Sequence, residues 1–175
     1  MESLPLIVKY LLTGLIGMVP IIELRGAIPI GVFTFGLNYV ESFLCAFIGN
    51  VIPIYFILKY IKPIFKWLSR WKLFKKFIDW ITKRANKKIA KSKKLQTAVN
   101  LGLFLFVAIP IPGTGAWTGA LIAALLDLEP KKAFWPIFFG VLTAGIIILL
   151  LTAGAKGGVD YLLQSNLTKE AIRLF

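Results

Sequence analysis

Histidine is absent from the 175-residue sequence, and cysteine occurs once, as Cys45. The first absence excludes imidazole acid–base chemistry and histidine metal ligation, and a lone cysteine excludes an intrachain disulfide or a cysteine metal cluster. Acidic residues are also scarce, with eight against 21 basic ones. Because no nucleophile–base pair is present and only one acid lies deep in an apolar region, we expect neither an enzyme nor a metal or cofactor site.

Apolar residues, by contrast, make up 58% of the sequence, and its mean hydropathy is +0.79. Ordinary soluble domains are about half apolar. Two mainly apolar runs, 40–61 and 133–153, are long enough to cross a bilayer, which takes about 20 residues. The composition therefore predicts an all-α integral membrane protein in which residues 1–175 form a single domain.

Two further apolar regions, 4–37 and 95–126, are broken by proline, glycine and charged residues. Each divides into two arms of roughly 13 residues, about 20 Å of helix, too short to cross about 30 Å of hydrocarbon. Such arms suit a re-entrant hairpin, which enters the membrane, turns, and leaves on the same side. The residues expected at the hairpin turns are Pro20, Gly26, Pro29, Pro110, Pro112, Gly113, Gly115 and Gly119.

The order of elements repeats along the chain. A Val-Pro-Ile run at 19–21 and an Ile-Pro-Ile run at 109–111 each close a first arm, and each hairpin precedes one clean span. This order predicts an inverted repeat, a plan found in many transporters, with halves at 4–61 and 95–153 and a tail at 154–175. The alternative is six ordinary, tilted helices with kinks.

The net charge of +13 is concentrated between Lys59 and Lys94, where fourteen basic residues accompany one acid. Positive loops stay inside, so this segment is predicted to be cytoplasmic. Its apolar residues recur at helical spacing, which indicates an amphipathic helix on anionic lipid headgroups rather than a nucleic-acid site. The predicted helix either only anchors the protein to the membrane surface or senses the lipids there. The basic residues expected at the membrane surface are Lys62, Lys66, Arg70, Lys75 and Lys76.

Glu23 and Arg25 are the main candidates for function, because ionisable residues inside a membrane usually face a cavity or a partner. Glu23 could carry a proton, since a dehydrated site favours the neutral carboxyl. Arg25 could bind a phosphate or carboxylate through its planar fork. The structural alternative is a Glu–Arg pair that closes the hairpin, with Glu23 capping the second arm.

The second turn is uncharged but offers the hydroxyls of Thr114 and Thr118. Both second arms begin at the turns, and helix N-termini favour anions. Asn50, in the middle of the first span, could donate a hydrogen bond to a turn. Together these residues predict a site for an anionic group, while the glycines of the second arm could equally form only a close-packing face.

Two motifs, PIIELRGAIP at Pro20–Pro29 and PIPGTGAWTG at Pro110–Gly119, resemble those of the putative small multidrug export protein family over residues 4–153. That family is distantly similar to the DedA/VTT membrane proteins, which have paired re-entrant hairpins and are linked to lipid-phosphate translocation and scrambling. The resemblance implies a multi-pass transporter in a bacterial or archaeal cytoplasmic membrane. DedA-like proteins carry arginines in the second hairpin, whereas here the only hairpin arginine is Arg25.

We therefore expect proton-coupled translocation of a small or lipid-borne phosphate through a midplane site between the hairpins. Glu23 would be the proton carrier and Arg25 the anion binder. The alternatives are a multidrug exporter, a lipid scramblase, and a scaffold that acts through the basic segment without transport. Two spans and two hairpins leave thin lipid-facing walls, which favours a homodimer.

Overall fold

The computed structural model describes residues 4–68, 93–111 and 113–173. Within these ranges all regular secondary structure is helical, which confirms the predicted all-α class. The helices are α1 (Leu6–Met18), α2 (Glu23–Phe33), α3 (Tyr39–Leu68), α5 (Lys93–Ala108), α6 (Ala116–Leu125) and α7 (Pro130–Arg173).

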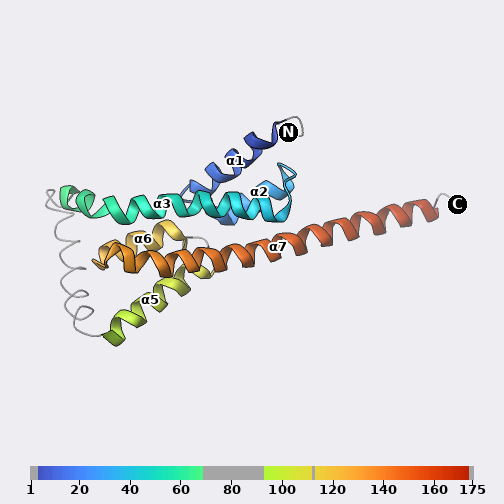
Figure 1. Ribbon diagram of the computed structural model, residues 1–175. Helices are drawn as coiled ribbons and strands as arrows, with labels where there is room; N and C mark the ends of the chain where they lie inside the picture. The colour runs from blue at the N-terminus through green and yellow to red at the C-terminus, as the bar shows by residue number, and fades with distance from the viewer. Residues whose placement is uncertain (1–3, 69–92, 112, 174–175) are drawn as a thin grey trace.

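Two long helices, α3 and α7, run in opposite directions side by side through the molecule (Figure 1). The pair α1–α2 folds as one hairpin and the pair α5–α6 as another, approaching from opposite ends of the long helices (Figure 1). The second arm of each hairpin, α2 or α6, packs against both α3 and α7. The two hairpin turns consequently meet near the middle of the bundle.

The segments Tyr39–Ile61 of α3 and Pro130–Gly158 of α7 are long and apolar enough to cross a membrane. Only 28% and 33% of their most apolar windows are buried, so most of that surface faces outward. Apolar surface of this extent is not stable against water. The arrangement is that of a membrane protein, and both predicted spans lie within these segments.

The helix α7 does not stop at residue 153, where the sequence analysis placed the start of a separate tail. It continues to Arg173 and projects beyond the other helices (Figure 1). Its helix-weakening residues past that point are Gly154, Gly157 and Gly158, and a glycine costs a helix interior only about 1 kcal/mol. No proline follows to end the helix, so the apolar run and the tail form one element.

Local signals account for the helix ends near the first hairpin. The helix α1 ends at Met18, two residues before Pro20, whose ring disfavours helical backbone in the preceding residue. At the start of α3, the Asn38 side chain accepts from the Glu41 amide at 2.8 Å, and the Glu41 carboxylate accepts from the Asn38 amide at 3.2 Å. This reciprocal capping box fixes where α3 begins.

Small residues allow the first arms to lie close to the long helices. On α3, Gly49 meets the backbone of Gly14 in α1 so closely that a Cβ would overlap the Gly14 carbonyl oxygen. On α7, a Cβ at Gly140 would lie 2.8 Å from the Val107 side chain and 3.0 Å from the Phe104 carbonyl oxygen of α5. Small-residue interfaces of this kind are typical of helices packed inside membranes, where close backbone approach replaces the hydrophobic driving force.

The predicted amphipathic surface helix falls largely outside the described residues. Lys62 and Lys66 belong to the last turns of α3, but their side chains are not described. Arg70, Lys75 and Lys76 lie outside the described ranges. The surface role of these five residues stays a prediction.

Candidate functional site at the junction of the hairpins

Glu23 is the first residue of α2, and its side chain is buried, with 3% exposed. Its carboxylate accepts hydrogen bonds from the backbone N–H groups of Ala116, at 3.3 Å, and Trp117, at 3.2 Å. These are the first two residues of α6, so the acid of the first hairpin caps a helix of the second hairpin. The carboxylate thereby satisfies N–H groups that have no partner within the helix, and it complements the positive end of the helix dipole.

The backbone at Glu23 lies in the left-handed region, with φ of 49°. A residue with a side chain adopts this conformation only when its surroundings hold it there, and such residues cluster at functional sites. The cap is one such constraint. Gly115, just before α6, lies directly against this carboxylate, and a Cβ at Gly115 would overlap it. The glycine in the second motif is therefore needed for space at the cap.

Arg25 lies in the first turn of α2 and reaches the turn of the second hairpin. Its Nη1 donates to the carbonyl oxygen of Ile111 at 2.8 Å. Its Nη2 lies within 3.1–3.3 Å of the carbonyl oxygens of Val107, Ile109 and Thr114. Val107 belongs to the last turn of α5, so the guanidinium also complements the negative end of that helix.

Glu23 and Arg25 therefore bind the opposite hairpin rather than each other. Among the described residues, no ion pair joins the two side chains, and the alternative of a Glu–Arg pair closing the first hairpin is wrong. Both side chains have partners in the second hairpin instead, the carboxylate at backbone N–H groups and the guanidinium at carbonyl oxygens. Glu23 binds the N-terminal end of α6, and Arg25 binds the C-terminal end of α5.

Two further side chains complete the junction. The Thr114 hydroxyl lies 2.9 Å from the carbonyl oxygens of both Ile109 and Ile111, and it accepts from Arg25 at 3.3 Å. The Trp117 indole N–H donates to the Met18 carbonyl at the end of α1, at 3.1 Å. Sequence reasoning missed Trp117. Its signal was a large aromatic residue with an N–H donor inside a run of prolines and glycines.

The other candidate binding residues have different surroundings. Thr118 lies inside α6 and is half-buried. Asn50 is fully buried on α3, and neither its Oδ1 nor its Nδ2 has a hydrogen-bond partner among the described residues. The expected hydrogen bond from Asn50 to a hairpin turn is therefore not formed in this structure. Arg25 Nε is likewise buried without a partner.

The predicted turn residues divide into two groups. Pro20, Pro110, Gly113 and Gly115 lie in the turns, and Gly113 has φ of 88°, which favours glycine. Pro112 lies outside the described residues. Three other predicted turn residues lie inside helices instead, namely Gly26 and Pro29 in α2 and Gly119 in α6.

A physical reason accounts for the residues placed inside helices. Pro29 has no N–H to bond the Arg25 carbonyl, but a proline is tolerated in a membrane helix where neighbouring groups satisfy the freed carbonyl. Gly119 lies against the Val107 side chain, where a Cβ would approach to 2.6 Å. The two glycines, Gly26 and Gly119, lie at close contacts within the bundle. Proline and glycine alone were therefore an imprecise marker of where the chain reverses.

A comparison with family models matches residues 23–147 to the family described as putative small multi-drug export protein. The match covers well over half of the chain and begins at Glu23. It includes most of the first motif, all of the second, the whole of α3 and the first part of α7. Comparisons with curated proteins and with solved structures found no match. The chain therefore belongs to the putative small multi-drug export protein family.

Proposed function

We propose that this protein is a transporter of a bacterial or archaeal cytoplasmic membrane. We also propose that both hairpins are re-entrant and that each hairpin, with the long helix that follows it, forms one half of an inverted repeat. Three features support the arrangement. The hairpin helices have 13, 11, 16 and 10 residues, all short of the roughly 20 that a span requires. Their turns meet in the middle of the bundle, and α2 and α6 make matching contacts with the two long helices. The basic segment 59–94, which begins in the last turns of α3, supports a cytoplasmic position for that end.

The observation that carries the proposal is the way Glu23 and Arg25 are held. Their hydrogen bonds go to helix ends and turn carbonyls of the opposite hairpin, where ligand groups can replace them. The Glu23 carboxylate occupies an anion site at the N-terminus of α6. An anionic substrate can compete for the same N–H groups and for the nearby guanidinium of Arg25.

A transport step follows from this competition. When Glu23 takes up a proton, it loses the charge that favours the helix N-terminus, and its cap on α6 weakens. The freed N–H groups of Ala116 and Trp117 then bind a phosphate-like group together with Arg25. Proton and anion therefore occupy the junction together, and the substrate class is a small or lipid-borne phosphate.

A second candidate is export of organic cations. The observation that favours it is the group of backbone carbonyls around Arg25, contributed by Val107, Ile109, Ile111 and Thr114. These oxygens suit any cation, and an organic cation that displaced Arg25 would meet Glu23 nearby. The family description, small multi-drug export, accords with this substrate class.

The test is transport by purified protein in liposomes, with and without a pH gradient. Three probes are compared: a fluorescent lipid phosphate, inorganic phosphate and a cationic dye. We expect gradient-dependent movement of a phosphate probe that is lost in Glu23→Gln and in Arg25→Ala. The matched control is Glu129→Gln, an acid-to-amide change in an exposed side chain outside the junction. Elution volume and apparent Tm in detergent show whether each variant is folded.

The other outcomes select other functions. Movement of the dye but not of phosphate, lost in Glu23→Gln, would establish cation export. Lipid flipping that ignores the gradient and survives both substitutions would indicate a scramblase. Absence of transport for all three probes would contradict a transporter for these substrate classes and would favour a scaffold acting through the basic segment 59–94.

A further inference from the structure

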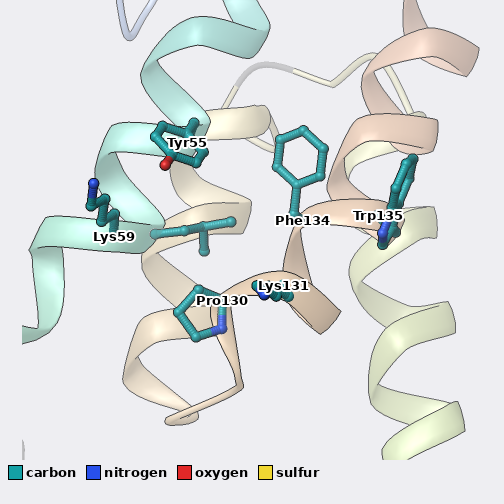
Figure 2. Close-up of a pocket in the computed structure, with 7 residues that line it drawn as sticks. Tyr55, Lys59, Pro130, Lys131, Phe134 and Trp135 are labelled. Atoms are coloured by element: carbon teal, nitrogen blue, oxygen red, sulfur yellow. The ribbon is translucent and has the colours of Figure 1, made fainter.

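A cavity of about 460 Å³ lies between the later part of the α3 span and the beginning of α7 (Figure 2). In Figure 2, Tyr55 and Lys59 lie on α3, Phe134 points from α7 toward Tyr55, and Trp135 lies on the far side of α7. The cavity is lined by Tyr55, Leu58, Lys59, Pro130, Lys131, Phe134 and Trp135. Neither Glu23 nor Arg25 contributes to this lining.

The lining combines positive charge with apolar walls. Among the residues that the structure describes, it contains two lysines and no carboxylate, and the remaining residues are aromatic or aliphatic apart from the Tyr55 hydroxyl. The Lys59 ammonium lies 5.6 Å from the centre of the Tyr55 ring. The nearby carboxylate of Glu129 contacts Lys132, which does not line the cavity, at 2.6 Å. A ligand that suits this chemistry carries an anionic head on an apolar body.

The position of the cavity suits a membrane ligand. Tyr55 and Trp135 are more than half exposed, so the cavity is open to the surroundings of the bundle. Tryptophan, tyrosine and lysine near the end of a span are typical of the headgroup level of a bilayer. The strongly basic segment 59–94 begins at Lys59 itself, which assigns this level to the cytoplasmic side.

Apolar stripes lead from the cavity toward the middle of both spans. On α3, Ile48, Ile52 and Tyr55 recur at helical spacing and are all exposed. On α7, exposed apolar residues recur in the same way at Trp135, Phe139, Ile146 and Leu150. Each stripe begins at a residue that lines the cavity, and each provides an apolar surface for a hydrocarbon chain.

We propose that this cavity binds the phosphate headgroup of an anionic phospholipid from the cytoplasmic leaflet. Lys59 and Lys131 contact the phosphate as point charges, and the aromatic rings of Tyr55 and Trp135 border the glycerol region. The acyl chains follow the stripes of α3 and α7. Basic pockets between membrane helices are suited to such headgroups. The site is independent of the proposed transport step, since it shares no residue with the junction.

Lipid binding to purified full-length protein in detergent tests the proposal, with native mass spectrometry as the readout. Phosphatidylglycerol and phosphatidylcholine are titrated separately. We expect preferential retention of phosphatidylglycerol, which the double variant Lys59→Ala/Lys131→Ala weakens about thirtyfold, since each basic side chain at an anionic surface contributes about fivefold. Lys59→Arg/Lys131→Arg keeps both charges and should retain the preference.

The matched control is Lys75→Ala/Lys76→Ala, which removes the same charge from the basic segment and changes none of the described residues that line the cavity. We expect it to reduce phosphatidylglycerol binding far less than the cavity variant does. Equal losses in the two double variants would overturn the proposal, and so would equal retention of the two lipids by the native protein. Saturable binding of inorganic phosphate that depends on Lys59 and Lys131 would also overturn it, in favour of a soluble anion.

Discussion

The carboxylate of Glu23 lies 3.2 Å from the backbone nitrogen of Trp117, 94 positions later in the chain, and accepts its hydrogen bond. Arg25, two residues after Glu23, donates to the Ile111 carbonyl in the same turn. The two sequence motifs, Pro20–Pro29 and Pro110–Gly119, therefore contact each other in the folded protein. The charged residues of the first motif bind the helix ends and the exposed backbone of the second, which explains why the second needs no charge of its own.

Replacing Gly115 by alanine should break this contact without touching a charged residue. The new Cβ would overlap the Glu23 carboxylate, which must then leave the amides of α6. Buried groups that lose a partner in this way cost about 1–3 kcal/mol. We expect a lower apparent Tm in detergent and the same loss of transport as in Glu23→Gln.

The control for this prediction is Gly154→Ala in α7, where a new Cβ meets nothing within 4 Å. Alanine favours a helix interior by about 1 kcal/mol over glycine, so this variant should be as stable as the native protein or slightly more stable. A Gly115→Ala protein with native Tm and native transport would show that the Glu23 cap is dispensable.

Arg25→Lys should fail to replace arginine, although it conserves the charge. A guanidinium presents a planar set of donors that contacts several carbonyls at once, whereas an ammonium is a compact point charge on a flexible stem. We expect Arg25→Lys to lower the apparent Tm nearly as much as Arg25→Ala, because either change removes the planar donor that joins the carbonyls of Val107, Ile111 and Thr114. Lys131→Arg, at an exposed site, is the control and should leave Tm unchanged. A native Tm for Arg25→Lys would mean that charge alone holds the turn.

The sequence was sufficient to predict the elements and the important residues of the first motif. Hydropathy and the length of apolar runs are local properties, so the helical class, both spans, and the turns near Pro20 and Pro110 could be predicted. Glu23 and Arg25 stood out because charge is costly in apolar surroundings. Both residues do lie at the meeting point of the hairpins.

The hydrogen-bond partners of Glu23 and Arg25 could not be predicted. They are backbone atoms about 90 positions away in the chain, and almost every residue carries the same backbone groups, so composition does not distinguish them. The same applies to Gly115, whose need for space depends on a carboxylate from the other half of the chain. Trp117 was missed because its indole contact with Met18 is also tertiary. Pro29 was misplaced because proline usually ends a soluble helix but is tolerated within a membrane one.

Gly49→Ala tests the close approach of the first arm to its long helix. A Cβ at Gly49 would overlap the backbone carbonyl of Gly14, and a backbone atom cannot move aside as a flexible side chain can. Inserting a methyl group into a tight interface typically costs about 1–3 kcal/mol, which exceeds the gain in helix propensity. We expect a lower Tm, while Gly102→Ala in α5, with nothing within 4 Å, should show none of this loss. Equal stability of the two variants would show that α1 is free to move away from α3.

Asn38→Ala tests whether the capping box fixes the start of α3 and the loop that precedes it. The Asn38 side chain accepts from the Glu41 amide at 2.8 Å, and Glu41 also accepts from the Tyr10 hydroxyl at 2.9 Å, so the box ties the loop to α1. Loss of an N-cap side chain costs about 1 kcal/mol, whereas aspartate and serine are comparably good caps. We expect Asn38→Ala to lower the apparent Tm in detergent and Asn38→Asp to restore most of the loss. If alanine and aspartate were equally stable, the start of α3 would be determined by packing against α1 rather than by its cap.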